Sequence, residues 1–288
     1  MTPATFTAAD VQRIAAFSDG DQGGNPAGVW IGEALPPDAA MQRIAHEIGY
    51  SETAFAAPLG DGWRVRYFSP ESEVPFCGHA TIALGAALAA GHGDGVYGLS
   101  LNDAAITVEG RRTIGAGGAV LTSAALQSPP TRSAPAPQEV VERALALFGY
   151  GLIDLDPRIA PALAHGGAGH LVLALRSRAL LAAMRYDLNA GRRFMREVGI
   201  VTVVLAWAET ETLFHTRNPF ASGGVYEDPA TGAGTAALAG YLRDLDWPHG
   251  GAIDVVQGED MGMRSRLRAE IGAARGGSIR VSGTARAL

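Results

Sequence analysis

Two apolar runs in this chain predict two buried helices. No residue from Ala80 to Ala90 is charged, and the run is followed by Gly91, a residue that favours the end of a helix. A helix that is apolar on every side is buried, and about 11 residues are too few to span a membrane. The first run therefore predicts a buried helix that begins near Gly78 and ends at Gly91.

The same pattern recurs in the second half of the chain. Glu73 to Leu88 and Glu227 to Leu242 share seven of their sixteen residues without a gap, and 236–242 carries no charge. Segment 47–56 resembles 197–206 in a similar way. We interpret the chain as two copies of one unit, each with a strand followed by a buried helix.

Shorter patterns predict the remaining elements. Helices are expected over 36–48, where Gly49 ends the pattern, over 138–148, and over most of 178–198. Strands are expected over 11–17, 27–31, 51–56, 63–68, 97–101, 105–108, 119–121, 159–163, 171–175, 201–207, 213–217, 252–257, 264–271 and 278–281. Short strands that alternate with helices favour an α+β or a mixed α/β fold.

Four prolines predict a linker between two domains. Pro129, Pro130, Pro135 and Pro137 lie within residues 127–138. We place the boundary just before this segment, with a first domain over 1–122 and a second over 123–275.

Composition narrows the class of protein. The chain of 288 residues has a net charge of −6, and its 23 Lys and Arg residues are scattered, which disfavours nucleic acid as a partner. The N-terminus shows no signal peptide and no run predicts a membrane span, so we expect a cytoplasmic protein without a membrane partner. A single cysteine excludes an intramolecular disulfide and a cysteine-rich metal site.

Polar positions that differ between the two copies are the candidates for chemistry, because positions that match serve the fold. These positions are Glu52, Cys77, His79 and Asp228, which stand opposite Thr202, Thr231, Ala233 and Val74. Two carboxylates and an imidazole form an acid–base set and not a metal site. Metal ligands are therefore not expected.

Each candidate also has a purely structural interpretation. Glu52 is expected in a strand beside small residues, where burial raises a carboxyl pKa, but it is otherwise an ordinary exposed strand residue. His79 at a helix start tends to stay neutral, or it merely caps the helix. Asp228 before Pro229 fits a helix N-cap. Cys77 fits a small buried hydrophobic residue.

Six short motifs, in this order, resemble the phenazine-biosynthesis isomerase (PhzF-like) family, which shares the diaminopimelate epimerase fold. They are Gly24–Val29, Ser51–Phe55, Arg66–Pro70, Cys77–Thr81, Glu227–Gly232 and Gln257–Gly262. The resemblance implies two similar domains, each a curved sheet around a central buried helix, with the active site in a cleft and the C-terminal strand, 276–288, returning to the first domain. We expect the two domains to be related by a pseudo-twofold axis. It also implies a homodimer that needs no metal or organic cofactor.

The resemblance assigns roles to particular residues. The acid–base carboxylate falls on Glu52, and the catalytic His and Asp fall on His79 and Asp228. The substrate contacts are assigned to Asn25, Cys77, Gly78, Thr231, Gly232 and Ala233. The family often has Ser where this chain has Ala233, so a hydroxyl group that would bind substrate or relay a proton is missing.

The leading hypothesis is a cofactor-independent isomerase that acts on a small carboxylic acid. Backbone N–H groups near Gly78 and Gly232 would hold the substrate carboxylate, because helix N-termini favour anions. The alternatives are an amino-acid racemase or epimerase, and a non-catalytic protein that binds small carboxylates. An epimerase that uses two thiols is not expected, because the counterpart of Cys77 is Thr231.

Overall fold

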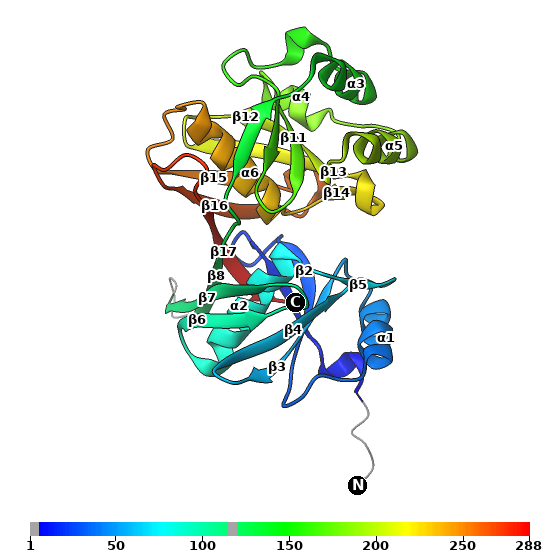
Figure 1. Ribbon diagram of the computed structural model, residues 1–288, viewed down its shortest axis with the longest axis vertical. Helices are drawn as coiled ribbons and strands as arrows, with labels where there is room; N and C mark the ends of the chain where they lie inside the picture. Colours follow the sequence, from blue (N-terminus) through cyan, green and yellow to red (C-terminus); the bar gives the residue numbers. More distant parts are fainter. Residues whose placement is uncertain (1–5, 115–119) are drawn as a thin grey trace. The chain divides into compact units, whose positions relative to one another are not determined.

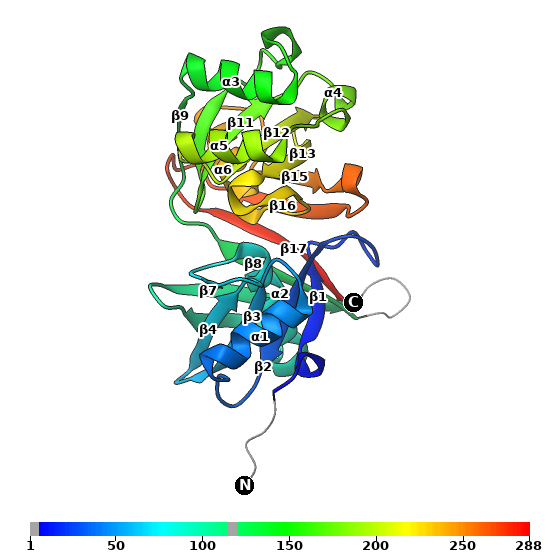
Figure 2. The same ribbon diagram turned by 90° about the vertical axis from the view of Figure 1, so that its right-hand side faces the viewer.

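The computed structural model of the chain describes residues 6–114 and 120–288. The chain forms two compact units. Unit 1 comprises residues 1–126 together with 282–288, and unit 2 comprises residues 127–281. Both units combine a mixed sheet with helices (Figure 1, Figure 2). The predicted α+β class is therefore confirmed.

Unit 1 contains a mixed sheet and two main helices. Its elements are β1 (Gln12–Ala16), β2 (Asn25–Ile31), α1 (Asp38–Ile48), β3 (Thr53–Leu59), β4 (Gly62–Phe68), β5 (Glu73–Val74), α2 (Gly78–His92), β6 (Gly95–Ser100), β7 (Ala105–Ile114) and β8 (Val120–Gln127). The end of β17 (Ile279–Ala287) also belongs to this unit and pairs antiparallel with β1, with Ile14 opposite Ala287.

The strands of unit 1 form both parallel and antiparallel pairs. β2 and β3 are parallel and α1 connects them, whereas β3 with β4 and β4 with β5 are antiparallel. β4 and β6 are again parallel, with α2 between them in the chain, and β7 returns antiparallel to β6. Parallel strands need such a crossover, so both helices have a topological role.

Helix α2 is the buried helix that the sequence predicts. All residues from His79 to Ala89 are buried. A Cβ at Gly110 of β7 would lie 2.3 Å from the carbonyl oxygen of Gly85, so strand and helix backbones are in direct contact. The helix ends at His92 and not at Gly91, because one Gly costs a helix only about 1 kcal/mol and the break comes at Gly93, which has φ +98°.

Unit 2 also combines strands with helices. They are β9 (Arg132–Pro135), α3 (Gln138–Phe148), β10 (Ala162–His165), β11 (Gly169–Ala174), α4 (Arg178–Ala182), α5 (Leu188–Val198), β12 (Thr202–Ala208), β13 (Leu213–Phe220), β14 (Val225–Asp228), α6 (Gly232–Asp244), β15 (Ala252–Gln257) and β16 (Ser265–Ile271).

The strands of unit 2 pair in the same order and sense as those of unit 1. β11 and β12 are parallel, β12 with β13 and β13 with β14 are antiparallel, β13 and β15 are parallel, and β16 is antiparallel to β15. Helix α6 connects β14 to β15 and is buried from Gly234 to Arg243. It therefore holds the same topological place in unit 2 that α2 holds in unit 1.

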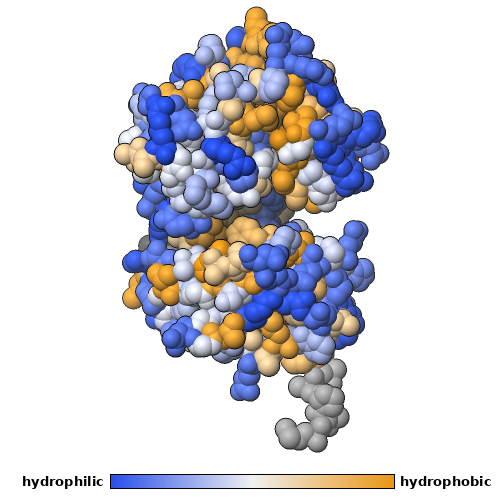
Figure 3. All heavy atoms as spheres, viewed as in Figure 1, coloured by the Kyte–Doolittle hydropathy of each residue, from blue (hydrophilic) through white to orange (hydrophobic). Residues whose placement is uncertain are grey.

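The outer helices pack on the sheets through the faces that their sequence patterns indicate. Helix α1 buries Met41, Ile44 and Ala45 against the aromatic rings of Trp30 and Phe55. In unit 2, α3 and α5 cover a cluster of aliphatic side chains from β11 and β12. Hydrophilic and hydrophobic residues are interspersed on the face drawn in Figure 3.

Two predicted segments differ in the structure. Residues 132–135 of the proline-rich segment form β9, an antiparallel partner of β10, because Pro135 stands at the end of the strand and Pro129 and Pro130 precede it. Segment 178–198 is divided into two helices, because the Asp187 carboxylate accepts the N–H of Ala190 and starts α5 anew.

Within the described residues, no helix combines the length and the apolar character that crossing a membrane requires.

Candidate active site

Three of the predicted site residues form a cluster in unit 1. Nε2 of His79 lies 3.6 Å from Oε2 of Glu52, and Nδ1 of the same ring lies 3.3 Å from Sγ of Cys77. The Ser51 hydroxyl is 3.4 Å from Nε2 of His79. His79 therefore stands between a carboxylate and a thiol, and the structure brings together the carboxylate and the imidazole of the predicted acid–base set.

The first turn of α2 positions Cys77 and His79. Cys77 is the N-cap, with an extended backbone at φ −143°, and Gly78 is the first helical residue. The Thr81 hydroxyl donates to the Cys77 carbonyl oxygen over 2.7 Å and also bonds the buried Tyr67 hydroxyl at 2.6 Å. Burial raises the pKa of Tyr67, so this phenol keeps its hydroxyl proton at neutral pH.

The sequence predicts Glu52 within a strand, but the residue lies immediately before β3. Its carbonyl oxygen accepts the N–H of Gly28, so its backbone is fixed to β2, and its carboxylate lies 3.6 Å from the His79 ring. The Glu52 side chain is 17% exposed and that of His79 is 8% exposed. Asn25, at the start of β2, is 3% exposed.

The geometry of this cluster suits proton transfer. A partly buried carboxylate is a general base when a neighbouring group orients it and water is largely excluded. The first N–H groups of α2 have no carbonyl of a preceding helical turn to bond, and together with the helix dipole they favour an anion at a helix N-terminus. The start of α2 thus has a carboxylate, an imidazole and helix N-terminal N–H groups close together.

The cluster also contains the donor types of a metal site. Among the described residues, Glu52, Cys77 and His79 form a group of side chains that could bind a metal ion together. Each offers one ligand atom, and these atoms all lie within 4.8 Å of one another. The prediction that the site holds no metal stays a prediction.

The other predicted residues lie at the start of α6 in unit 2. Thr231 is the N-cap, Gly232 the first helical residue and Ala233 the second. The Thr231 hydroxyl donates to Oδ2 of Asp228. The sequence indicates Asp228 as the N-cap of this helix, but Asp228 is the last residue of β14. Pro229 and Ala230 lie between it and the cap residue.

Gln257 holds this helix start in place, and sequence reasoning gave it no role. Its side chain is fully buried, and its Nε2 donates to the carbonyl oxygen of Asp228 over 2.7 Å and to the Thr231 hydroxyl over 3.0 Å. Its Oε1 accepts the N–H of Thr231 over 3.2 Å. The signal in the sequence is a polar residue at the end of an apolar strand, directly before Gly258.

Gly258 must be glycine for two reasons. Its φ is +72°, which L side chains rarely adopt. A Cβ at this position would also lie 2.5 Å from the carbonyl oxygen of Met263 and 2.8 Å from that of Pro229. The turn after β15 therefore packs directly on the segment that leads into α6.

An Arg–Glu pair precedes each buried helix. In unit 1, Nε and Nη2 of Arg66 donate to the two carboxylate oxygens of Glu73 over 2.7 and 2.6 Å. In unit 2, the same two nitrogens of Arg217 donate to Glu227. Glu73 and Glu227 are identical in the sequence repeat, and both pairs tie the last strand before the helix to its neighbour. These matching residues therefore serve the fold.

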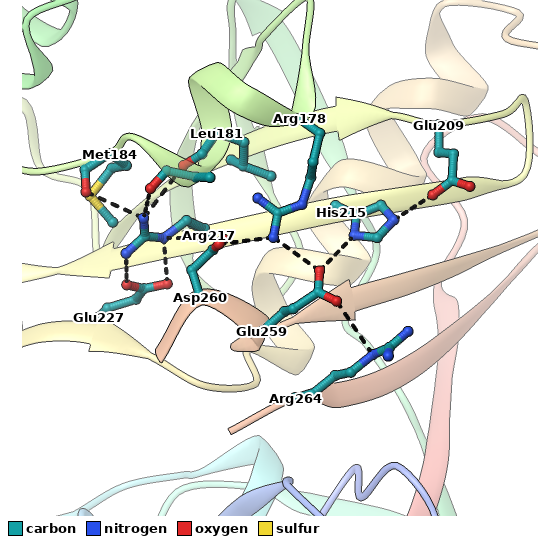
Figure 4. A network of polar contacts seen from close by, with 11 residues as sticks. Arg178, Leu181, Met184, Glu209, His215, Arg217, Glu227, Glu259, Asp260 and Arg264 are labelled. Carbon is teal, nitrogen blue, oxygen red and sulfur yellow. Dashed lines mark hydrogen bonds and ion pairs between the residues drawn. The ribbon is translucent and has the colours of Figure 1, made fainter. Parts of the chain in front are cut away.

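The pair in unit 2 extends into a network that surrounds the turn after β15 (Figure 4). Arg178 donates to Glu259 and to Asp260 over 3.0 and 2.9 Å. Nη1 of Arg217 also donates to the Ala182 carbonyl oxygen over 3.0 Å, and His215 lies between Glu209 and Glu259. The network joins α4, β13 and the turn, and it supports the segment that holds Asp228.

The chain is similar to a group of known proteins over nearly all of its length. The sequence profile of the phenazine biosynthesis-like protein family (PhzC-PhzF) matches residues 14–288. A trans-2,3-dihydro-3-hydroxyanthranilate isomerase of Pseudomonas aeruginosa is 31% identical over 280 residues, which cover 96% of this chain and 95% of that protein. An uncharacterized isomerase of Deinococcus radiodurans is 35% identical over 233 residues, 80% of this chain and 74% of that protein.

Solved structures share the fold at lower identity. A PhzF-family phenazine biosynthesis protein of Bacillus anthracis has a TM-score of 0.83 at 20% identity and covers 96% of each chain. A probable proline racemase of Agrobacterium radiobacter has a TM-score of 0.60 at 13% identity, covering 96% of this chain and 90% of the other. The chain therefore shares its fold with a PhzF-family protein and with a probable proline racemase, as expected for the predicted epimerase-like fold.

Proposed function

The chain belongs to the phenazine biosynthesis-like (PhzC-PhzF) family, and we propose that it is a cofactor-independent isomerase that moves a proton on a small carboxylic acid. Relatives that match most of the chain are named isomerases. The observation that carries the proposal is the 3.6 Å separation of Glu52 and His79 at the start of a buried helix.

In the proposed reaction, Glu52 is both base and acid. Its carboxylate accepts a proton from a carbon of the substrate, and the electron pair of that C–H bond moves into the conjugated system of the substrate carboxylate. The resulting negative charge is stabilised by N–H groups at the start of α2. Protonated Glu52 then returns the proton to a different carbon, so the product is an isomer and no atom is gained or lost.

His79 is proposed to orient Glu52 and a polar group of the substrate. Its side chain is 8% exposed and approaches the carboxylate through Nε2, so it restricts the rotation of Glu52. The second ring nitrogen, Nδ1, lies 3.3 Å from Sγ of Cys77. Gly78 is proposed to contribute its backbone N–H, and Cys77 and Asn25 to contact the substrate.

Asp228 at the end of β14 is proposed as a further catalytic residue, and Thr231, Gly232 and Ala233 as substrate contacts. Support comes from the common pairing order of the two units, which makes the starts of α2 and α6 equivalent elements, and we propose that the units are copies of one duplicated unit. A double-mutant cycle with Glu52→Gln and Asp228→Asn tests the joint role. Residues that act as one unit give strongly non-additive losses, and simple additivity of the two losses would separate them.

Two other functions have specific support. The fold likeness to a probable proline racemase favours an amino-acid racemase or epimerase. Ala233 favours a protein that binds small carboxylates without catalysis, because a serine at this place would add a hydroxyl at the first turn of α6. A two-thiol racemase lacks support, because Cys77 is the only cysteine.

A ligand screen followed by isotope exchange tests these functions. Small carboxylic acids, including trans-2,3-dihydro-3-hydroxyanthranilate, which names the activity of one relative, are screened by thermal shift. Each stabilising acid is then incubated with the protein in D2O. Deuterium at a new carbon supports the isomerase, deuterium at one stereocentre with inversion supports the racemase, and binding without exchange supports the non-catalytic protein.

The oligomeric state, the cellular location and the independence from metals are also proposed. A homodimer in the cytoplasm is proposed from the family resemblance, and light scattering after gel filtration would contradict it by a mass near that of the 29.8 kDa monomer. Independence from metals is proposed from the acid–base set, and a loss of turnover after dialysis against a chelator would contradict it.

A further inference from the structure

The donor atoms of Glu52, Cys77 and His79 are spaced for a common cation. Nε2 of His79 lies 3.6 Å from Oε2 of Glu52 and 4.0 Å from Sγ of Cys77, and all three side chains offer an atom within 4.8 Å of the other two. In a tetrahedral zinc site with bonds of about 2.0–2.3 Å, neighbouring ligand atoms are roughly 3.3–3.8 Å apart. Small side-chain rotations therefore place the three donors on one ion.

We propose that Glu52, Cys77 and His79 form an inhibitory binding site for a thiophilic divalent cation of the zinc type. The cation occupies the lone pairs of the Glu52 carboxylate and so removes the base from the reaction. The binding itself is independent of the proposed isomerase function, and only the inhibition rests on that function.

The donor set selects the class of cation. A thiolate, an imidazole and a carboxylate are the ligands of zinc and of related soft or borderline ions. Magnesium and calcium require six or more oxygen ligands, which these residues do not provide. Three protein ligands leave a fourth position open, and the substrate carboxylate or water would occupy it.

The position of the site also suits a divalent cation. Cys77 is the N-cap of α2, and its sulfur is a donor atom that zinc prefers. Glu52 supplies a carboxylate oxygen, and its side chain is only 17% exposed. The three donors therefore lie in a partly buried place.

Cobalt(II) provides a probe that needs no substrate. A thiolate bound to cobalt gives a charge-transfer absorption, and Cys77 is the only cysteine of the chain, so this band can come from no other residue. Titration of the full chain with cobalt is expected to give the band together with the strong visible absorption of a four-coordinate ion. Addition of zinc is expected to displace the cobalt and remove both.

Single variants test each ligand. Cys77→Ser is expected to abolish the charge-transfer band, and Glu52→Gln and His79→Asn to weaken cobalt binding at least about tenfold. His92→Asn is the matched control, because His92 is the exposed last residue of the same helix, and its affinity is expected to equal that of the unmodified chain. Absence of the band overturns the site. So does a band whose affinity is unchanged in both the Glu52 and the His79 variants.

Turnover measurements test the inhibition separately. Zinc is expected to reduce turnover at the concentrations that saturate the cobalt site, and a chelator to restore it fully. Binding that leaves turnover unchanged contradicts the inhibition. If Glu52→Gln turns over normally, the proposed function fails, while the cobalt titration still decides whether the site exists.

Discussion

Nε2 of His79 lies 3.6 Å from Oε2 of Glu52. The two residues come from different elements, since Glu52 precedes β3 and His79 opens α2, and they are 27 positions apart in the chain. The contact joins the sheet of unit 1 to the start of its buried helix. We propose that this partly buried carboxylate, 17% exposed beside the imidazole, acts as a general base.

Replacement of Glu52 by Gln keeps the shape of the side chain and removes the base. Turnover is expected to fall by roughly a hundredfold or more, because general base catalysis contributes about that much. The circular dichroism spectrum and the urea midpoint are expected to stay close to those of the unmodified protein. Near-normal turnover in this variant would remove Glu52 from the mechanism.

Cys77 is expected to be dispensable for proton transfer. Its counterpart Thr231 carries a hydroxyl that is far too weak an acid to replace a thiol, so the two-thiol reaction has no second group. Cys77→Ser and Cys77→Ala are expected to retain most turnover, and thiol alkylation to act only through the bulk of the added group. A well-folded Cys77→Ser protein without turnover, beside an active Glu52→Gln protein, would favour a one-thiol mechanism instead.

The two equivalent Arg–Glu pairs are expected to differ in their effect on stability. Arg217 and Glu227 are 8% and 3% exposed as side chains, whereas Arg66 and Glu73 are 16% and 26% exposed. Glu227→Gln leaves a buried guanidinium without its counter-charge and is expected to lower the free energy of unfolding by about 3 kcal/mol or more.

Glu73→Gln is the matched comparison. Its pair is screened by solvent, so the loss is expected to stay below about 1.5 kcal/mol. Urea denaturation of both variants measures the difference. Equal losses would show that burial does not govern the strength of these pairs.

His170 is expected to make stability depend on pH. Burial lowers the pKa of His170 to about 3, and its Nδ1 contacts the Thr202 hydroxyl at 2.8 Å. The unfolded chain has the ordinary His pKa of about 6.5. Below that value the unfolded state binds the proton and the folded state does not, so stability falls as the pH decreases, by up to about 1.4 kcal/mol per pH unit.

Replacement of His170 by Gln removes this titration. Urea denaturation between pH 7 and pH 4.5 is expected to show a flatter decline in the variant than in the unmodified protein. The exposed His92 serves as the control, and His92→Gln is expected to leave the slope unchanged. Parallel slopes for His170→Gln and the unmodified protein would contradict the low pKa.

The sequence allowed the prediction of much of the fold, because hydrophobic pattern alone marks a buried helix. The uncharged run after Ala80 predicts α2, and the pattern before Gly49 predicts α1 with its buried residues. Strand boundaries followed less well. Residues 132–135 pair with β10, and this pairing joins segments that a local pattern does not connect.

The candidate cluster contains residues that differ between the two similar stretches of the sequence. Glu52, Cys77 and His79 differ from the residues opposite them, and the structure places the three together in unit 1. Gln257 was not predicted, because its role depends on burial beside the segment after Asp228, 29 positions earlier in the chain. The ion-pair network around Asp260 was missed for the same reason, since its members come from α4, β13 and the turn after β15.

Deuterium exchange from solvent directly tests whether Glu52 moves a proton on carbon. The protein and a bound carboxylic acid are incubated in D2O, and proton NMR follows each carbon-bound hydrogen of the acid. We expect exchange at the carbons between which the proton moves, and a fall of roughly a hundredfold or more in the exchange rate for Glu52→Gln. Exchange that proceeds equally fast in the Glu52→Gln variant would contradict the claim that this carboxylate moves the proton.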